Sequence, residues 1–289
     1  MTNQRKIEHE IEIDAPVETV WKALTDASEL MRWFPLDARA EPGPGGIIWY
    51  SWGPPYEGKN RIEVWDPPRR LKLTDASIGG HHVVEAAKAT GAAIEEPSAR
   101  RVAMDFTLEA AAGGKTLLRL VHSGFGEGAD WDEEFDATSR GWVHEFLGLR
   151  HYLEGQRGED RRCVWARQKI ELPREETWNR LMSSKGLNLE GLARGDSFDR
   201  VISTGDRLQG NVLLCKPPND FCAIIANLNG SFFRVSNEYW SKPRPHAEPN
   251  LWLSTYGLLN HQALAIQASL TKLLARLFPA QIELPSLTP

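Results

Sequence analysis

Cysteine is scarce in this sequence, and the few cysteines form no motif. Only three, Cys163, Cys215 and Cys222, occur among 289 residues, and no two of them make a Cys-x-x-Cys pair. An odd number of widely spaced cysteines argues against a disulfide framework of the kind that holds small secreted domains together. We therefore expect reduced thiols.

Long apolar runs are also missing. The sequence has no stretch of about 18 apolar residues, the length that a membrane-spanning helix needs. Residues 1–14 are rich in charge and contain no apolar signal-peptide core. Both absences favour a cytoplasmic protein with no membrane insertion.

Charge of one sign is not in large excess either. The net charge of −5 is too small to indicate a polyanionic partner, and Lys and Arg do not cluster with aromatic residues, so we expect no nucleic-acid binding. The charge is nevertheless uneven, with 26 acidic and 18 basic residues up to Gly158 and 13 acidic and 16 basic residues after it. The length of 289 residues suits two domains of ordinary size.

The first half of the chain reads as one strand, a short helix and a strand meander. Apolar and charged residues alternate over residues 6–14, which predicts a half-buried strand, and Asp14 is expected to cap a short helix that follows. Pro-Pro and Gly-Gly pairs separate five further apolar runs that predict strands, at 47–52, 56–65, 71–74, 102–109 and 117–123. Residues 78–97, which are rich in alanine, are interpreted as an insertion.

A long helix is predicted to close this half. Acidic residues crowd its start at 130–134, where the helix dipole favours carboxylates. Trp142, Phe146, Leu149 and Leu153 recur at helical spacing and form an apolar stripe that must lie on the sheet.

The residue pattern at the start of the first half recurs in the second half of the chain. Four residues recur at a constant distance of 157 positions: Ile13, Pro16, Trp21 and Leu24 are matched by Ile170, Pro173, Trp178 and Leu181. Residues 155–160 have the polar composition of a linker. We therefore expect two related domains at 1–157 and 161–289, the second degenerate in sequence and closed by a helix over 260–278.

Three segments carry a family resemblance. Asp-Ala-Pro-Val-Glu-Thr-Val-Trp-Lys-Ala-Leu-Thr-Asp at 14–26, Trp-Phe-Pro at 33–35, and Leu-Val-His-Ser-Gly-Phe-Gly at 120–126 resemble START-like (SRPBCC) domains of the Hsp-90 ATPase activator homologue branch. The resemblance covers residues 5–155 and is faint beyond 160. It implies an α+β fold of tandem helix-grip domains, each a curved antiparallel sheet wrapped around a long C-terminal helix. Relatives include lipid carriers, polyketide cyclases, hormone receptors and a co-chaperone, so it implies a ligand cavity rather than a reaction.

Aromatic residues are the candidates for lining that cavity. The sequence contains 11 tryptophans, which either line a pocket or fill a core. The candidate ligand-binding residues are Trp33, Phe34, Trp49, Tyr56, Trp65, His122, Phe125, Trp142 and Phe146. His122 is the polar candidate, either as an anchor or acid/base group or as a core histidine.

These observations favour binding of an apolar or aromatic small molecule by the first domain, with the second domain mainly structural. The alternatives are a cyclase or dehydratase that uses His122 with Tyr56 or Glu57, and a co-chaperone-like module with a chaperone- or stress-related protein partner. We assign no catalytic residue and expect no cofactor and no metal, because the adjacent His81 and His82 would point apart. Ser123 forms no nucleophile elbow, since Val121 stands where that motif needs glycine.

Overall fold

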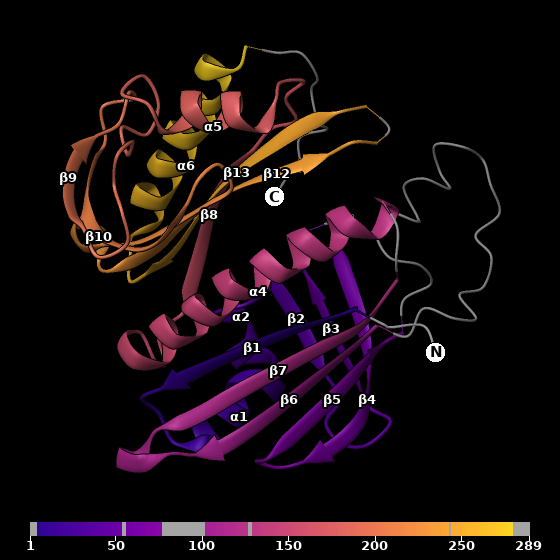
Figure 1. Ribbon diagram of the computed structural model, residues 1–289. Coiled ribbons are helices and arrows are strands. Elements are labelled where there is room, and N and C mark those ends of the chain that lie inside the picture. The colour runs from indigo at the N-terminus through magenta and orange to yellow at the C-terminus, as the bar shows by residue number, and fades with distance from the viewer. Residues whose placement is uncertain (1–4, 54–55, 77–101, 127–128, 243, 280–289) are drawn as a thin grey trace. The chain divides into compact units, whose positions relative to one another are not determined.

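The computed structural model describes residues 5–53, 56–76, 102–126, 129–242 and 244–279 (Figure 1). The chain divides into two compact units, Met1–Gly158 and Glu159–Pro289. The insertion predicted at 78–97 and the pair His81-His82 lie outside the described residues.

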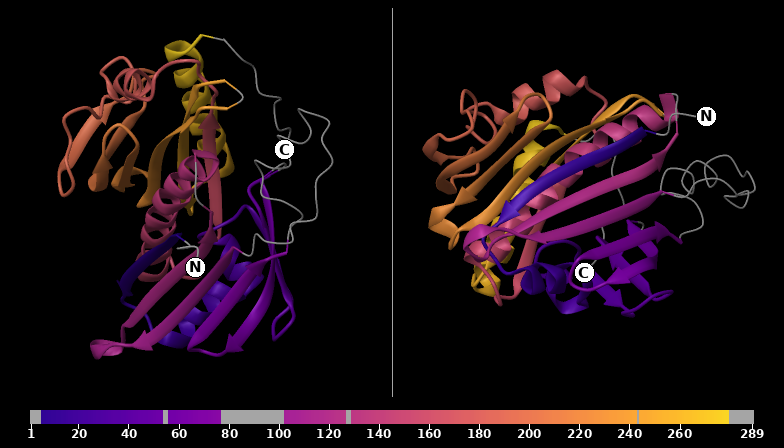
Figure 2. Two further views of the ribbon diagram at one scale, coloured as in Figure 1. Left: turned by 45° about the vertical axis from the view of Figure 1, so that its right-hand side comes forward. Right: turned by 60° about the horizontal axis from the view of Figure 1, so that its bottom comes forward.

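The first unit is a seven-stranded antiparallel sheet with a long helix. Its strands lie in the order β1-β7-β6-β5-β4-β3-β2. Their bounds are β1 Arg5–Ile13, β2 Asp37–Ala40, β3 Ile47–Ser51, β4 Glu57–Asp66, β5 Arg70–Asp75, β6 Ala103–Ala110 and β7 Thr116–Phe125. The helices are α1 Val17–Thr25, α2 Ala27–Met31 and α4 Ala129–Gly155, with a single 3-10 turn η1 at Ala112–Gly114. Figure 2 shows the sheet curving around the side that carries the helices.

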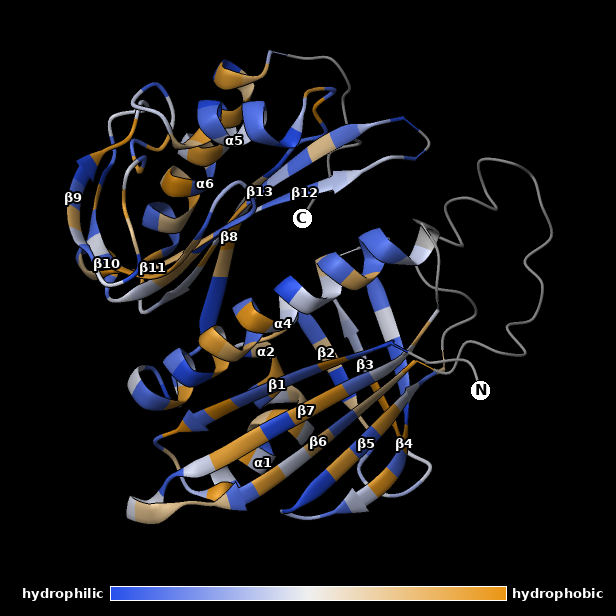
Figure 3. Ribbon diagram, in the orientation of Figure 1, coloured by the Kyte–Doolittle hydropathy of each residue, from blue (hydrophilic) through white to orange (hydrophobic). Residues whose placement is uncertain are grey.

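Helix α4 packs on the sheet through the predicted apolar stripe. Trp142, Phe146, Leu149 and Leu153 are all buried. At the sheet edge, His9 of β1 is within hydrogen-bonding distance (3.0 Å) of the Ser139 carbonyl of α4. Hydrophobic and hydrophilic bands alternate along the strands beneath (Figure 3). This alternation places one face of the sheet against the helix.

The start of α1 differs from the prediction. Asp14 does not cap the helix; the N-cap residue is Pro16, and no side chain caps this end. The backbone N–H of Asp14 donates to the Glu154 side chain of α4 at 2.9 Å, and the backbone N–H of Ala15 donates to the Ile13 carbonyl at 2.9 Å. The chain therefore turns tightly at the end of β1 before the helix begins.

The second unit repeats this plan with six antiparallel strands. Their order is β8-β13-β12-β11-β10-β9. Their bounds are β8 Arg161–Arg167, β9 Ser197–Val201, β10 Arg207–Lys216, β11 Asp220–Ile225, β12 Ser231–Trp240 and β13 His246–Tyr256. The helices are α5 Arg174–Met182 and α6 Asn260–Leu277, with a 3-10 turn η2 at Ala226–Leu228. Helix α6 packs on β8, where the Gln267 side chain accepts a hydrogen bond from the Trp165 backbone at 2.8 Å.

The internal repeat is visible in the register of equivalent hairpins. The β4–β5 pairing shifts register between Ile62 and Val64, and the β10–β11 pairing shifts between Val212 and Leu214. Helices α1 and α5 both follow a proline N-cap, Pro16 in one unit and Pro173 in the other. The predicted architecture of tandem helix-grip domains, each an antiparallel sheet with a long C-terminal helix, is confirmed. In the described part of the second unit, the strand order contains no counterpart of β2.

Candidate functional site

A continuous aromatic cluster lies in the first unit, between the sheet and its helices. The aromatic cluster consists of Trp33, Phe34, Tyr50, Trp52, Phe106, His122, Phe125, Trp131, Phe135, Trp142 and Phe146. They come from the segment after α2, from β3 and the residue after it, from β6 and β7, and from α4. Residues far apart in the sequence thus form one network of ring contacts.

Trp142 is the centre of this cluster. Its ring lies 6.0 Å from Phe34, 5.8 Å from Phe106 and 5.9 Å from Phe146, measured between ring centroids. These distances are typical of stacked and edge-to-face aromatic pairs, which contribute about 0.5–1.5 kcal/mol each beyond their buried area. The side chain is only 7% exposed. Trp142 therefore links helix α4 to strands β6 and β7 of the sheet.

The Trp142 indole also defines the proton position on His122. The indole Nε1–H donates to His122 Nδ1 at 2.8 Å. Because an indole nitrogen can only donate, Nδ1 of His122 must be the unprotonated acceptor. In the neutral imidazole the proton is then on Nε2.

His122 itself is buried in apolar surroundings. It lies on β7 between Ile7 of β1 and Met104 of β6, and its ring packs edge-on against Phe125 at 4.8 Å. Burial lowers the pKa of His122 to about 4, so the ring is neutral at pH 7. Its Nε2 is buried and has no hydrogen-bond partner among the described residues. The site thus contains a neutral N–H donor for which the described residues supply no acceptor.

Phe34 connects this centre to a second part of the cluster. Its ring lies 5.3 Å from Tyr50 and 4.9 Å from Trp52. Burial raises the pKa of Tyr50 to about 12, with the Asp75 carboxylate acting in the same direction. The phenol therefore stays neutral and can donate or accept a hydrogen bond.

Gly58 makes room for the Tyr50 ring. The two residues are paired across β3 and β4, and a Cβ at Gly58 would be 2.4 Å from Tyr50 Cε2. We expect Gly58→Ala to destabilise the first domain by about 1–2 kcal/mol, because the ring must move away from Phe34 and Trp52. Urea unfolding of the single variant and of Gly58→Ala in a Tyr50→Leu background measures the coupling. Equal costs in the two backgrounds would contradict this account.

Six of the nine predicted ligand-binding residues lie in the aromatic cluster. They are Trp33, Phe34, His122, Phe125, Trp142 and Phe146. Their role in binding a ligand remains a proposal.

The other three predicted residues lie elsewhere. Trp49 is next to Tyr50 on β3, so its side chain lies on the opposite face of the sheet. There the Arg39 guanidinium carbon lies 5.0 Å from the centroid of the Trp49 ring. Trp65 packs against Trp21 of α1, with ring centroids 5.1 Å apart. Tyr56 lies in the turn between β3 and β4, where its carbonyl accepts from the Trp52 backbone N–H at 2.9 Å.

Sequence analysis missed Tyr50, Trp52, Phe106, Trp131 and Phe135. Residues 47–52 are almost entirely apolar, so their pattern does not tell which side chains face the helix. Trp131 and Phe135 could have been found, since they are spaced i, i+4 and Phe135 precedes Trp142 by seven residues, which places both on the α4 stripe of Trp142 and Phe146.

Neither a metal-binding cluster nor a membrane-spanning helix is present among the described residues. Among them, no three His, Cys, Asp or Glu residues gather in a way that could hold a metal ion. No helix in the described part of the chain has both the length and the apolar character needed to cross a membrane.

Comparison with known proteins gives one family and several similar structures. Residues 14–154 match the family described as Activator of Hsp90 ATPase homolog 1-like protein. The Aha1 dimer from Colwellia psychrerythraea is 20% identical over 53% of this chain and 99% of that chain, with a TM-score of 0.42. No curated protein matches the chain.

Two similar structures extend over most of the chain. DynU16, from the dynemicin biosynthetic locus, is 18% identical over 94% of this chain and 97% of that chain, with a TM-score of 0.41. The di-domain ARO/CYC protein BexL, from the BE-7585A biosynthetic pathway, is 15% identical over 94% of this chain and 95% of that chain, with a TM-score of 0.43.

Proposed function

Because residues 14–154 make the first domain a START-like domain of the Activator of Hsp90 ATPase homolog 1-like type, we propose that this domain binds a small apolar or aromatic molecule between its sheet and α4. The molecule carries a carbonyl or hydroxyl oxygen that accepts a hydrogen bond from His122. Its apolar part contacts the rings of the aromatic cluster. The proposal concerns binding, and it assigns no reaction to the site.

The observation that carries the proposal is the unsatisfied N–H of His122. Its Nε2 is buried with no partner in the described part of the protein, while Nδ1 is occupied by Trp142. A buried donor without an acceptor costs about 1–3 kcal/mol, which a ligand oxygen would recover. Aromatic side chains around one or two polar groups are typical of small-molecule sites.

The second domain differs at the equivalent position. Counting back from Phe125-Gly126 and from Tyr256-Gly257, the place of His122 on β7 is taken by Leu253 on β13, a buried residue. The core around it is largely aliphatic. This contrast supports the proposal that the second domain has no matching apolar ligand site and mainly stabilises the chain.

Native mass spectrometry of the freshly purified full chain tests the proposal. We expect a mass excess that corresponds to one small molecule per chain and that organic extraction removes. His122→Leu, with folding checked by circular dichroism, is expected to lose the adduct, because leucine offers no donor. Trp49→Phe, on the opposite face of β3, is the matched control and is expected to keep it.

Two results would overturn the proposal. One is a ligand-free mass together with tryptophan fluorescence that does not change across a panel of lipids and aromatic carbonyl compounds. The other is an adduct that His122→Leu and Trp49→Phe retain equally, since the molecule would then bind elsewhere.

A further inference from the structure

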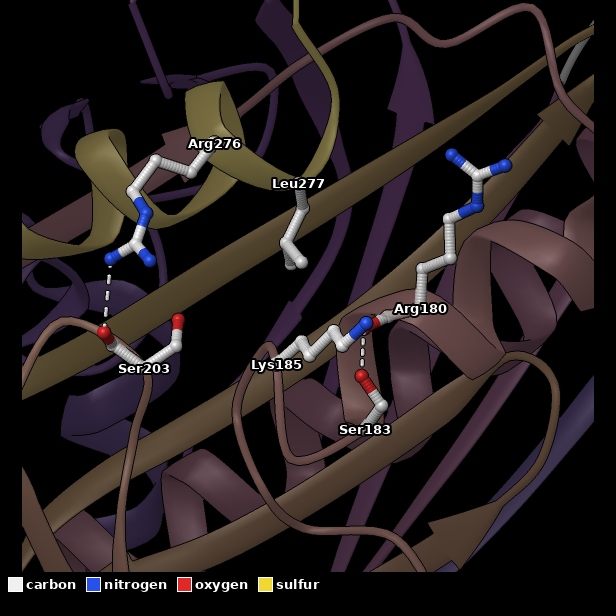
Figure 4. A pocket seen from close by; sticks show the side chains of 6 residues that line it. All are labelled: Arg180, Ser183, Lys185, Ser203, Arg276 and Leu277. Carbon is white, nitrogen blue, oxygen red and sulfur yellow. Dashed lines mark hydrogen bonds between the residues drawn. The ribbon is translucent and has the colours of Figure 1, made fainter.

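A pocket in the second domain has a chemistry different from that of the aromatic cluster. It lies where the end of α5 and the turn after it meet the β9–β10 turn and the last turn of α6 (Figure 4). Its volume is about 470 Å³. The lining residues are Arg180, Ser183, Lys185, Ser203, Arg276 and Leu277.

The pocket has a strongly basic lining. Three of its residues, Arg180, Lys185 and Arg276, are cationic, and none of the lining residues carries a carboxylate. Arg180 is paired with Glu176 one helical turn earlier on α5. In the described structure, Lys185 and Arg276 make no ion pair, so the pocket retains an uncompensated charge of about +2 at neutral pH.

Two of the polar groups are held in place before any ligand arrives. Arg276 Nη1 donates to the Ser203 carbonyl at 3.0 Å, which fixes the guanidinium at the pocket wall. The Ser203 backbone N–H donates in turn to the Gly186 carbonyl, at 2.9 Å. The Ser203 hydroxyl is buried and has no partner in the described structure, so it is available to a ligand.

The segment that carries Lys185 is rigid as well. The Gly186 N–H donates to the Ser183 carbonyl at 2.9 Å, and the Leu187 N–H donates to the Leu181 carbonyl at 2.8 Å. A Cβ at Gly186 would be 2.2 Å from the Leu181 carbonyl oxygen, so the turn closes this tightly only with glycine. Leu187 is fully buried. This packing holds the start of the Lys185 side chain at the rim of the pocket.

We infer that this pocket binds the phosphate group of a small organic phosphate. A phosphate monoester carries a charge of about −1.5 to −2 at pH 7 and presents three acceptor oxygens. Lys185 and Arg276 match that charge, and the Ser203 hydroxyl supplies a neutral donor. Leu277 gives an apolar wall for the organic part of the ligand. A carboxylate, with one charge and two oxygens, would leave one cation unmatched.

Isothermal titration calorimetry of the full chain at low ionic strength tests this inference. The probes are phenyl phosphate, inorganic phosphate and benzoate. We expect saturable binding of one phenyl phosphate per chain, competition by inorganic phosphate, and binding of benzoate at least tenfold weaker. Added salt should weaken phenyl phosphate binding, because exposed charges are screened.

Charge-neutral variants locate the site. Lys185→Gln and Arg276→Gln are each expected to weaken phenyl phosphate binding at least tenfold, and Ser203→Ala several-fold. Lys216→Gln, which removes an exposed lysine of β10 outside the pocket, is the matched control and should change affinity less than twofold. His122→Leu should leave phosphate binding unchanged, so this test is independent of the proposed function of the first domain.

The inference is overturned if neither phosphate compound binds saturably. It also fails if Lys216→Gln weakens binding as much as Lys185→Gln, because the attraction would then be a property of the whole surface. Equal affinity for benzoate and phenyl phosphate would contradict the assignment to phosphate.

Discussion

Truncation of Trp142 to alanine is expected to lower the free energy of unfolding of the first domain by about 3–5 kcal/mol, the usual cost of removing a large buried aromatic side chain. Trp142 contacts aromatic rings on both the sheet and α4 and is almost fully buried. Its loss would also leave Nδ1 of His122 without its donor. We expect this substitution to be among the most damaging in the domain.

Trp49 offers a matched control for the same change. It is also a tryptophan of this domain, but it is half-buried on the other face of β3, where its described ring contact is with Arg39. We expect Trp49→Ala to cost about 1 kcal/mol, the size of a partly exposed cation–π contact and some apolar surface. Hydrogen exchange of peptides from β6 and β7, together with urea unfolding of the full chain, measures both costs. Equal costs for the two variants would contradict the placement of Trp142 at the centre of the cluster.

The elements that sequence analysis predicted best are those with a strong period and a clear end. The α4 stripe from Trp142 to Leu153 was predicted residue by residue, because helical spacing over several turns leaves one buried face. The proline that precedes each first helix, Pro16 and Pro173, made the repeat detectable although the rest of the second copy diverges. Repeated local signals of this kind do not depend on tertiary contacts.

Short edge strands were not predicted. Strand β2 has four residues and β9 has five, and each pairs with a single neighbour at the edge of its sheet. Such strands carry too few residues for an alternating pattern to stand out. Pairing with β3 and β10 in the folded sheet sets their positions, and this pairing is not visible in the local sequence.

The sequence also did not predict which side chains of an apolar strand lie on which face of the sheet. On β3, Trp49 and Tyr50 are adjacent and equally suited to a pocket, and a shift of one residue exchanges the two faces of a strand. The prediction chose Trp49, and the ring contacts place Tyr50 in the cluster. The basic pocket of the second domain was missed for a related reason. Residues as far apart as Arg180 and Arg276 come to line one pocket only after α5 and α6 have packed.

Lowering the pH from 7 to 4 is expected to remove about 3 kcal/mol of stability through His122 alone, since each unit of pKa difference corresponds to about 1.4 kcal/mol. Burial lowers the pKa of His122 from 6.5 to about 4 in the folded protein. Between these two values the unfolded chain binds a proton that the folded protein does not. The contribution is therefore nearly complete above pH 6.5, declines as the pH falls, and is fully lost only below pH 4.

Protonation would also break a hydrogen bond. The imidazolium carries a proton on Nδ1, which would then face the indole N–H of Trp142 at the present distance of 2.8 Å. Two donors would oppose each other in a buried site. The folded protein must therefore either keep His122 neutral or separate α4 from β7.

The variant His122→Gln isolates this effect from the other titrating groups. Glutamine can accept the Trp142 N–H through its side-chain oxygen but does not titrate, so the variant keeps the hydrogen bond and loses the pH dependence. Urea unfolding at intervals between pH 4 and pH 7.5 gives the free energy of unfolding of both proteins. We expect the difference between them to change by about 3 kcal/mol across this range, with the wild type losing more toward low pH. If the free energy of unfolding depends on pH in the same way for both proteins, His122 titrates normally in the folded protein. The proposed ligand site, which requires a buried neutral imidazole, would then be wrong.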